Sequence, residues 1–163
     1  MRIIKLALIS AVVLFGLISL MSSFLPSQVR ISRAIDISAG KAQCFAALAN
    51  MEAWQQWNEY IKAYHHKKIE KNELESDEIT ISFTEKTDSL VVTEWQKPNG
   101  NKFGSGFVII GQDAKHTTVQ WYFDFHVRWY PWEKFQSIVF DQQFGPVMEK
   151  SLANLKKIAE AAP

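Results

Sequence analysis

The sequence predicts an α+β protein with an N-terminal transmembrane helix and an antiparallel sheet covered by a long C-terminal helix. Three observations lead to this prediction. A charge-poor apolar segment occupies residues 3–25, alternating strand patterns follow one another across short turns, and an amphipathic helical pattern runs over 147–160. Strands joined by short turns pair antiparallel, whereas strands alternating with helices would predict a parallel sheet.

The N-terminal segment has the length and composition of a membrane span. Between Ile3 and Leu25 the only charged residue is Lys5. About 20 helical residues cross the roughly 30 Å hydrocarbon layer of a bilayer. Arg2 and Lys5 precede the apolar run, and positive flanks stay cytoplasmic. We therefore expect residues 1–25 to form a single-pass anchor in the inner (cytoplasmic) membrane, with the N-terminus inside. The domain at 26–163 then faces the periplasm or the exterior.

A cleaved signal peptide is the alternative for this segment. Signal peptides have a shorter apolar core and a cleavage site of small residues. The candidate site Ser22-Ser23-Phe24-Leu25-Pro26 matches that pattern poorly. The sequence therefore favours an uncleaved anchor.

The domain begins with one strand and a helical region. Apolar residues alternate with polar ones over 29–37, and Arg33 falls in phase with the apolar set. Helical spacing follows over 38–50, and a second short helix carries the aromatic residues of 54–60. The first strand is therefore followed by two short helices rather than by a hairpin.

A run of strands comes next. The sequence Pro98-Asn99-Gly100-Asn101 has strong hairpin-turn chemistry, which supports direct pairing of its neighbours. Alternation of apolar and polar residues predicts the strands 79–84, 90–95, 103–109 and 118–129, with a weaker strand near 64–69.

The strand at 118–129 has one apolar and one mostly polar face. Its odd positions are all apolar: Val119, Trp121, Phe123, Phe125, Val127 and Trp129. Asp124, His126 and Arg128 share the opposite face, where we expect an exposed cross-strand ladder rather than an acid–base site. A face this rich in rings must be covered by a helix, or by a helix and a ligand.

The C-terminal region predicts that covering helix. Pro131-Trp132-Glu133 is typical of a helix start, and Gly145-Pro146 predicts a kink or a boundary between two helices. Beyond it, the apolar residues of 147–159 fall on one stripe, which includes Met148 and Leu152.

Several classes of function find no support. The chain carries 18 basic and 17 acidic residues, so nothing favours nucleic acid as a partner. Cys44 is the only cysteine and has no histidine near it in sequence, which predicts a buried filler rather than a nucleophile. His116 and His126 stand alone, so no metal site is expected, and no glycine-rich phosphate loop suggests a cofactor. We assign no catalytic residue.

Three segments resemble a known superfamily. They are residues 25–33, the helix pair of 42–48 with Trp54-Gln55-Gln56-Trp57, and the tail 144–156. Together they resemble the SRPBCC or START-like superfamily of polyketide cyclase/dehydrase and lipid-transport proteins, and the tail is similar to that of membrane-anchored bacterial members. The resemblance implies a helix-grip fold, in which a curved sheet wraps around the last helix and leaves a cavity. Members bind sterols, lipids, hormones or polyketides, and a minority catalyse cyclisation or dehydration without a universal motif.

The aromatic residues are the candidate ligand site. The residues expected near the cavity are Trp54, Trp57, Trp95, Phe107, Trp121, Phe123, Phe125, Trp129, Phe135, Met148 and Leu152. The alternative is that the same side chains fill the core. Arg33 and Glu94 are the charged residues expected to point inward, where they would orient a polar ligand group or pair with each other. If Trp95 points inward instead, Glu94 points out.

These expectations favour a membrane-tethered, non-catalytic carrier or binding domain for a small hydrophobic molecule or lipid. One alternative is a cyclase-like or dehydratase-like enzyme that uses Arg33 or Glu94. The other is an interaction module with a filled core and an exposed patch at Trp129–Trp132. Ligand identity and oligomeric state do not follow from the sequence.

Overall fold

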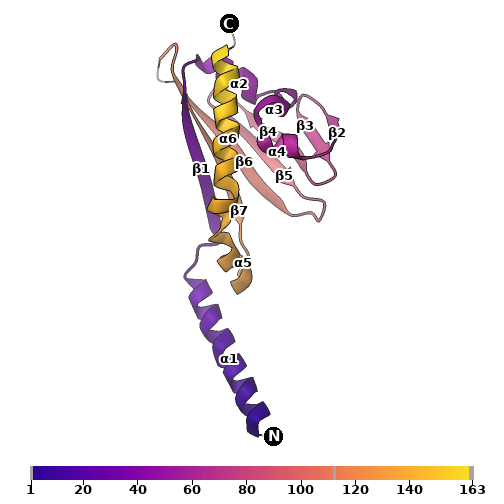
Figure 1. The fold of residues 1–163 in the computed structure, drawn as a ribbon, viewed down its shortest axis with the longest axis vertical. Helices are drawn as coiled ribbons and strands as arrows, with labels where there is room; N and C mark the ends of the chain where they lie inside the picture. Colours follow the sequence, from indigo (N-terminus) through magenta and orange to yellow (C-terminus); the bar gives the residue numbers. More distant parts are fainter. Residues whose placement is uncertain (1, 112, 162–163) are drawn as a thin grey trace.

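A computed structural model describes residues 2–111 and 113–161, apart from the side chains of 66 and 67, and confirms the predicted fold class (Figure 1). Within these residues seven strands form one antiparallel sheet, in the order β1-β7-β6-β5-β4-β3-β2. The strands are β1 (Gln28–Ile37), β2 (His66–Ile69), β3 (Glu73–Ser76), β4 (Thr80–Lys86), β5 (Leu90–Gln96), β6 (Lys102–Gly111) and β7 (Thr117–His126).

The helices gather on one face of this sheet. They are α2 (Lys41–Leu48), α3 (Met51–Trp57), α4 (Glu59–Ala63), α5 (Pro131–Ser137) and α6 (Phe140–Ala161). The long α6 runs along the sheet beside β1, and α2, α3 and α4 contact α6. The apolar helix α1 (Arg2–Ser23) projects from the end of the sheet that carries α5 (Figure 1). This is the helix-grip arrangement that the sequence predicts.

The register of β7 confirms its alternating faces. Trp121 lies opposite Arg33 of β1 and Phe107 of β6, on the face that α6 covers. On the other face, Arg30 of β1 lies opposite Asp124 and forms an ion pair of 2.6 Å with it. The strand ends at His126, three residues earlier than its sequence pattern suggests.

The structure contains one strand that the sequence patterns did not predict and one more helix than expected. The acidic segment before residue 79 forms a strand, β3, in which Leu74 and Ser76 are buried while Glu73 and Glu75 are exposed. The many acidic residues of this segment obscured the alternation of buried and exposed positions in its sequence. The helical region after β1 also contains three short helices instead of two, because Asn58 ends α3 and its side chain then caps α4 by accepting from the backbone N–H of Tyr60.

The sequence predicts a kink or a helix boundary at Gly145-Pro146, and the boundary is absent. The helix α6 runs through both residues, and the boundary with α5 falls at residues 138–139. Pro146 lies on the exposed side of α6, and because proline has no N–H, the carbonyl of Gln142 lacks its usual helical donor. Gly145 is buried against the guanidinium of Arg33, where a Cβ would collide.

Candidate functional site: a pocket with an aromatic wall at one end of the sheet

The rings between the sheet and the helices divide into a filled core and a pocket wall. Trp54, Trp57, Phe107 and Trp121 are fully buried in mutual edge and stacking contacts, with ring centroids 5.0–6.1 Å apart. Their indole N–H groups donate internally: Trp54 to the carbonyl of Leu48 at 2.8 Å, and Trp121 to the hydroxyl of Ser105 at 2.7 Å. At this end of the sheet, side chains fill the space between sheet and helices and the indole N–H groups have protein acceptors, so no ligand is needed there.

Met148 and Leu152 of α6 also belong to the filled part. Both side chains are essentially inaccessible to solvent. They lie on the stripe that faces the sheet, as the helical spacing predicts, but they do not line the pocket. The residues expected from sequence therefore lie partly in the filled core and partly in the pocket wall. The three-dimensional structure is needed to tell the two groups apart.

The pocket lies at the other end, near α5, and has a volume of about 690 Å³. Ligand pockets of small molecules fall in the range of about 300–1,000 Å³. Its lining residues are Tyr60, Tyr64, Ile79, Trp95, Lys97, Asn101, Lys102, Phe103, Phe123, Phe125, His126, Val127, Arg128, Glu133, Gln136, Phe140, Gln143 and Phe144. The pocket is thus built from β5, β6, β7, α4, α5 and the start of α6.

Aromatic side chains form its wall. Phe125 of β7 contacts Phe140 and Phe144 of α6, with ring centroids 4.9 and 4.8 Å apart. Phe123 continues this wall toward Trp95, at 5.2 Å. Rings in such offset and edge contacts form a firm apolar surface. Of the residues expected from sequence, Trp95, Phe123 and Phe125 lie here.

Two tyrosines close the wall without supplying reactive groups. The hydroxyl of Tyr60 donates to the carbonyl of Phe144 at 3.2 Å. Burial raises the pKa of Tyr60 far above its ordinary value, and burial also raises the pKa of Tyr64. Both phenols are therefore neutral at physiological pH, and neither is a base.

The rim of the pocket is polar, and two of its three cations are paired, Arg128 with Glu133 and Lys102 with Glu94. It carries Lys97, Lys102 and Arg128 against the single carboxylate of Glu133. Arg128 pairs with Glu133 at 2.8 Å, and hydrogen bonds from Arg128 lower the pKa of Glu133. The rim can therefore orient the polar or acidic end of a molecule whose apolar part contacts the rings.

Arg33 points to the inner face, as expected, but it does not line the pocket. Its guanidinium binds Asp141 at 2.9 Å and Glu149 at 2.7 Å, both on α6. Hydrogen bonds to Asp141 and then Glu149 raise its already high pKa further, so it stays charged. Arg33 joins β1 to α6 rather than orienting a ligand.

Glu94 was expected to point into the ligand cavity, and the structure places it elsewhere. Trp95 is buried, so Glu94 points to the opposite face of the sheet, where it pairs with Lys102 at 2.6 Å. It cannot pair with Arg33, because the two side chains lie on different faces. Glu94 instead lines a second hollow of about 650 Å³ on the outer face, together with Arg30 and Asp124.

Trp129 and Phe135 were also expected to line the cavity, and this expectation is wrong. Because β7 ends at His126, Trp129 lies in the loop that follows and is 68% exposed. Phe135 lies on α5 and is 38% exposed. Neither residue lines the pocket.

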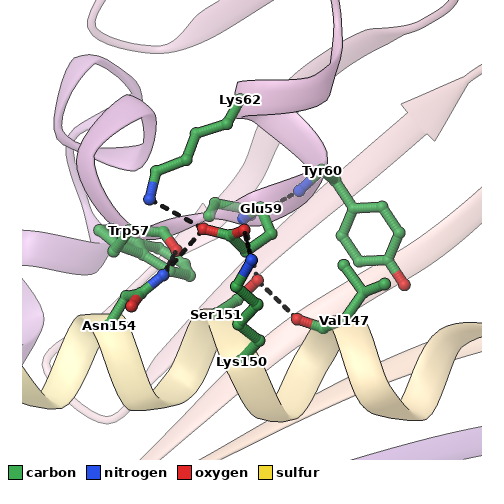
Figure 2. Close-up of polar contacts among 9 residues, drawn as sticks. Trp57, Glu59, Tyr60, Lys62, Val147, Lys150, Ser151 and Asn154 are labelled. Carbon is green, nitrogen blue, oxygen red and sulfur yellow. Dashed lines mark hydrogen bonds and ion pairs between the residues drawn. The ribbon is translucent and has the colours of Figure 1, made fainter.

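A polar cluster fixes α4, the helix that carries Tyr60, on α6 (Figure 2). The carboxylate of Glu59 accepts from Lys62 at 2.8 Å, Lys150 at 2.6 Å and Asn154 at 2.8 Å. Hydrogen bonds from Lys150 and Lys62 lower the pKa of Glu59 to about 2. The backbone N–H of Glu59 also donates to the hydroxyl of Ser151. These groups are all paired with one another, which indicates a structural role.

The sequence missed several wall residues. Phe103 is in phase with Phe107 on β6, and Tyr60 was assigned to a short helix, so both carried a usable signal. Phe140 and Phe144 are four residues apart on α6, but the expected break at Gly145-Pro146 hid this spacing.

The residues that line the pocket include no cysteine. Cys44 is buried away from it, and burial raises the pKa of its thiol. Within residues 2–111 and 113–161, no three histidine, cysteine or acidic side chains cluster as metal ligands would. The pocket itself offers apolar surface, a charged rim and a single imidazole, His126.

Comparison with known proteins agrees with this geometry. The sequence profile of a family described as polyketide cyclase / dehydrase and lipid transport matches residues 28–160. A search of curated proteins finds no match.

Solved structures resemble the fold at low sequence identity. A protein of unknown function from Staphylococcus aureus is 13% identical with a TM-score of 0.61, and the alignment covers 82% of this chain and 95% of that one. A START superfamily protein from Mycobacterium smegmatis is 18% identical with a TM-score of 0.50, covering 80% and 94%. Norcoclaurine synthase from Thalictrum flavum, in complex with dopamine and hydroxybenzaldehyde, is 8% identical with a TM-score of 0.57, covering 83% and 89%.

Proposed function

Because this chain belongs to the polyketide cyclase/dehydrase and lipid transport family, we propose that it is a membrane-tethered binding or carrier domain for a small hydrophobic ligand or lipid. In this proposal residues 1–25 are the anchor and 26–163 are the binding domain. The observation that carries the proposal is the pocket of about 690 Å³ near α5.

The distribution of polarity in the pocket supports an amphiphilic ligand. Phe125, Phe140 and Phe144 offer an apolar wall, and each buried methylene of a ligand against such a surface contributes about 0.8 kcal/mol. The rim carries the cations of Lys97 and Arg128. A molecule with an apolar body and a polar or acidic end fits both regions.

The properties of α1 support the tether. The helix has 22 residues, its side chains are exposed almost throughout, and its most apolar window has a mean hydropathy of 2.5. A signal sequence shares these properties. We favour the anchor because the cleavage site is poor, and Arg2 and Lys5 orient the N-terminus toward the cytoplasm.

Two observations argue against the catalytic alternative in the form that the sequence suggested. Arg33 is held by two carboxylates of α6, and Glu94 lies on the outer face of the sheet. Neither residue reaches the pocket. A cyclase-like or dehydratase-like activity would have to use other groups, so we propose binding without catalysis.

A pocket-blocking variant tests the proposal. Gln143 is exposed at the rim of the pocket, and its neighbour Gln142 is exposed on α6 outside the pocket. In full-length protein in detergent, Gln143→Trp should weaken binding of a fluorescent fatty acid by about tenfold, equivalent to about 1.4 kcal/mol, and Gln142→Trp should not.

Native mass spectrometry of the protein extracted from membranes provides the second measurement. A co-purifying lipid in the wild type and its loss in Gln143→Trp are expected. Absence of both a bound lipid and probe binding in the wild type would rule out the carrier function.

A further inference from the structure

Apolar side chains are exposed where α1 joins the domain. We call this group the aromatic base, and it consists of Phe24 (83% exposed), Trp129 (68%), Trp132 (61%), Ile138 (61%) and Val139 (48%). The ring of Tyr130 links the two tryptophans, with centroids 4.7 Å from Trp129 and 4.9 Å from Trp132. Large apolar residues gathered this way on a protein surface mark a contact with a membrane or a partner.

The aromatic base has a fixed position relative to α1. The helix α5, which carries Trp132, contacts α1, and Ser22 in the last turn of α1 is buried. The side-chain amine of Lys134 is also buried and donates to the carbonyl of Leu25 at 2.7 Å. Figure 1 shows α5 beside the end of α1 that meets the domain. The base therefore lies at the level where α1 ends.

That level corresponds to the membrane interface. With 22 residues at about 1.5 Å each, α1 is about 33 Å long, close to the roughly 30 Å of the hydrocarbon layer. Its last turn then emerges among the lipid headgroups. Tryptophan and tyrosine concentrate at this depth because their rings are apolar and their N–H or O–H groups remain hydrogen-bonded.

The same helix forms part of the pocket rim. Glu133 and Gln136 of α5 line the pocket, and Trp132 is exposed on that helix. A membrane contact through α5 would therefore place the pocket rim beside the lipid.

We propose that the aromatic base inserts into the interface of the leaflet from which α1 emerges, so that ligand passes between the bilayer and the pocket without crossing water. This inference rests on the membrane anchoring in the proposed function. The occupant of the surface is lipid rather than a protein, because the base is continuous with a helix that spans the bilayer.

Spin labels measure the depth of the base. The full-length chain with Ile138→Cys, and separately with Lys157→Cys near the far end of α6, is labelled and reconstituted in phosphatidylethanolamine–phosphatidylglycerol vesicles. Cys44 is fully buried, and the labelled wild type serves as the blank. The label at 138 should collide more with oxygen than with a water-soluble nickel chelate, and the label at 157 should show the reverse.

The outcomes distinguish the inference from its premise. If alkaline carbonate strips the protein from the vesicles, anchoring is wrong and both proposals fall. If the protein stays anchored but the label at 138 is as accessible to nickel as the label at 157, the inference alone is wrong. A label at 138 shielded from both reagents indicates contact with a second copy of the chain, which also overturns the lipid assignment.

A transfer assay gives an independent readout. Trp129→Ser combined with Trp132→Ser should slow the exchange of a fluorescent fatty acid between vesicles and the protein by about tenfold, a barrier increase of about 1.4 kcal/mol. Its affinity in detergent should not change, because neither residue lines the pocket. Ile110→Ser, which removes an exposed apolar residue from the sheet, is the matched control. Unchanged exchange in the double variant would overturn the inference.

Discussion

Individual charged residues join α6 to the rest of the domain. Arg33 of β1 binds Asp141 and Glu149 on either side of Gly145, and Glu59 of α4 binds Lys150. Such partly exposed pairs contribute only modestly to stability, because solvent screens them. Their main role is geometric, because they fix the position of the helix that carries Phe140 and Phe144.

The depressed pKa of Glu59 predicts a pH-dependent contribution to stability. The pKa of about 2 in the folded state lies below the ordinary value of 4.5. The contribution is therefore complete above about pH 5 and is lost as the pH falls from there through about 2. Glu59→Gln should lower the free energy of unfolding at pH 7 by on the order of 1 kcal/mol, and the difference from wild type should vanish near pH 2.

Urea unfolding of the full-length protein in detergent, followed by tryptophan fluorescence between pH 2 and 7, checks this. Glu85→Gln, an exposed carboxylate on β4, is the control and should show no such trend. A Glu59→Gln deficit that is constant across this range would mean that the charge of Glu59 is not the cause.

At the scale of the elements, the end of β7 and the start of α5 determine what the pocket is. Had β7 continued to Trp129, that ring would have covered the inner face. The strand ends at His126 instead, the loop turns Arg128 toward Glu133, and α5 forms one side of the opening. Trp129 and Trp132 are left exposed as a result.

Lys134 is the residue that holds α5 to the end of α1. Lys134→Met should remove the hydrogen bond to the Leu25 carbonyl and leave that acceptor without its partner, which costs about 1–3 kcal/mol. The segment from Phe24 to Ser27 should then be cut faster by chymotrypsin in detergent, whereas Lys134→Arg, which keeps a donor, should resist. Equal cleavage of the two variants would show that this bond does not hold the segment.

At the scale of the whole molecule, the pocket opens at the end of the domain nearest the apolar helix α1. The filled core around Trp54 and Trp121 occupies the sheet away from that end. The rings therefore pack against one another in this core, whereas the pocket lies at the end of the sheet that carries α5.

The proposed anchoring through α1 predicts a membrane topology for the full-length protein. The protein extracted from membranes should have the intact mass of 18.7 kDa, which shows that residues 1–25 remain attached. In intact cells, Lys157→Cys should react with a membrane-impermeant maleimide once an outer membrane, if present, is made permeable. A shorter mass would indicate a cleaved signal, and protection of the cysteine would indicate the opposite orientation.

The sequence by itself determined the fold. The alternation in residues 118–126, the hairpin at residues 98–101 and the stripe beginning at Val147 each follow from local geometry, because one buried face requires one periodicity. These patterns were sufficient to predict the antiparallel sheet, the helix that covers it and the apolar N-terminal helix.

Which of the buried rings line a pocket follows from the packing of distant elements and not from sequence periodicity. Trp121 and Phe125 have the same phase on the same strand, yet one is enclosed by Trp57 and Phe107 and the other faces the pocket. The face of the sheet on which Glu94 lies, and the end of β7 before Trp129, likewise became clear only from the three-dimensional structure. Periodicity reports which face a side chain takes, whereas the space above it depends on elements such as α5 and α6 that are distant in the sequence.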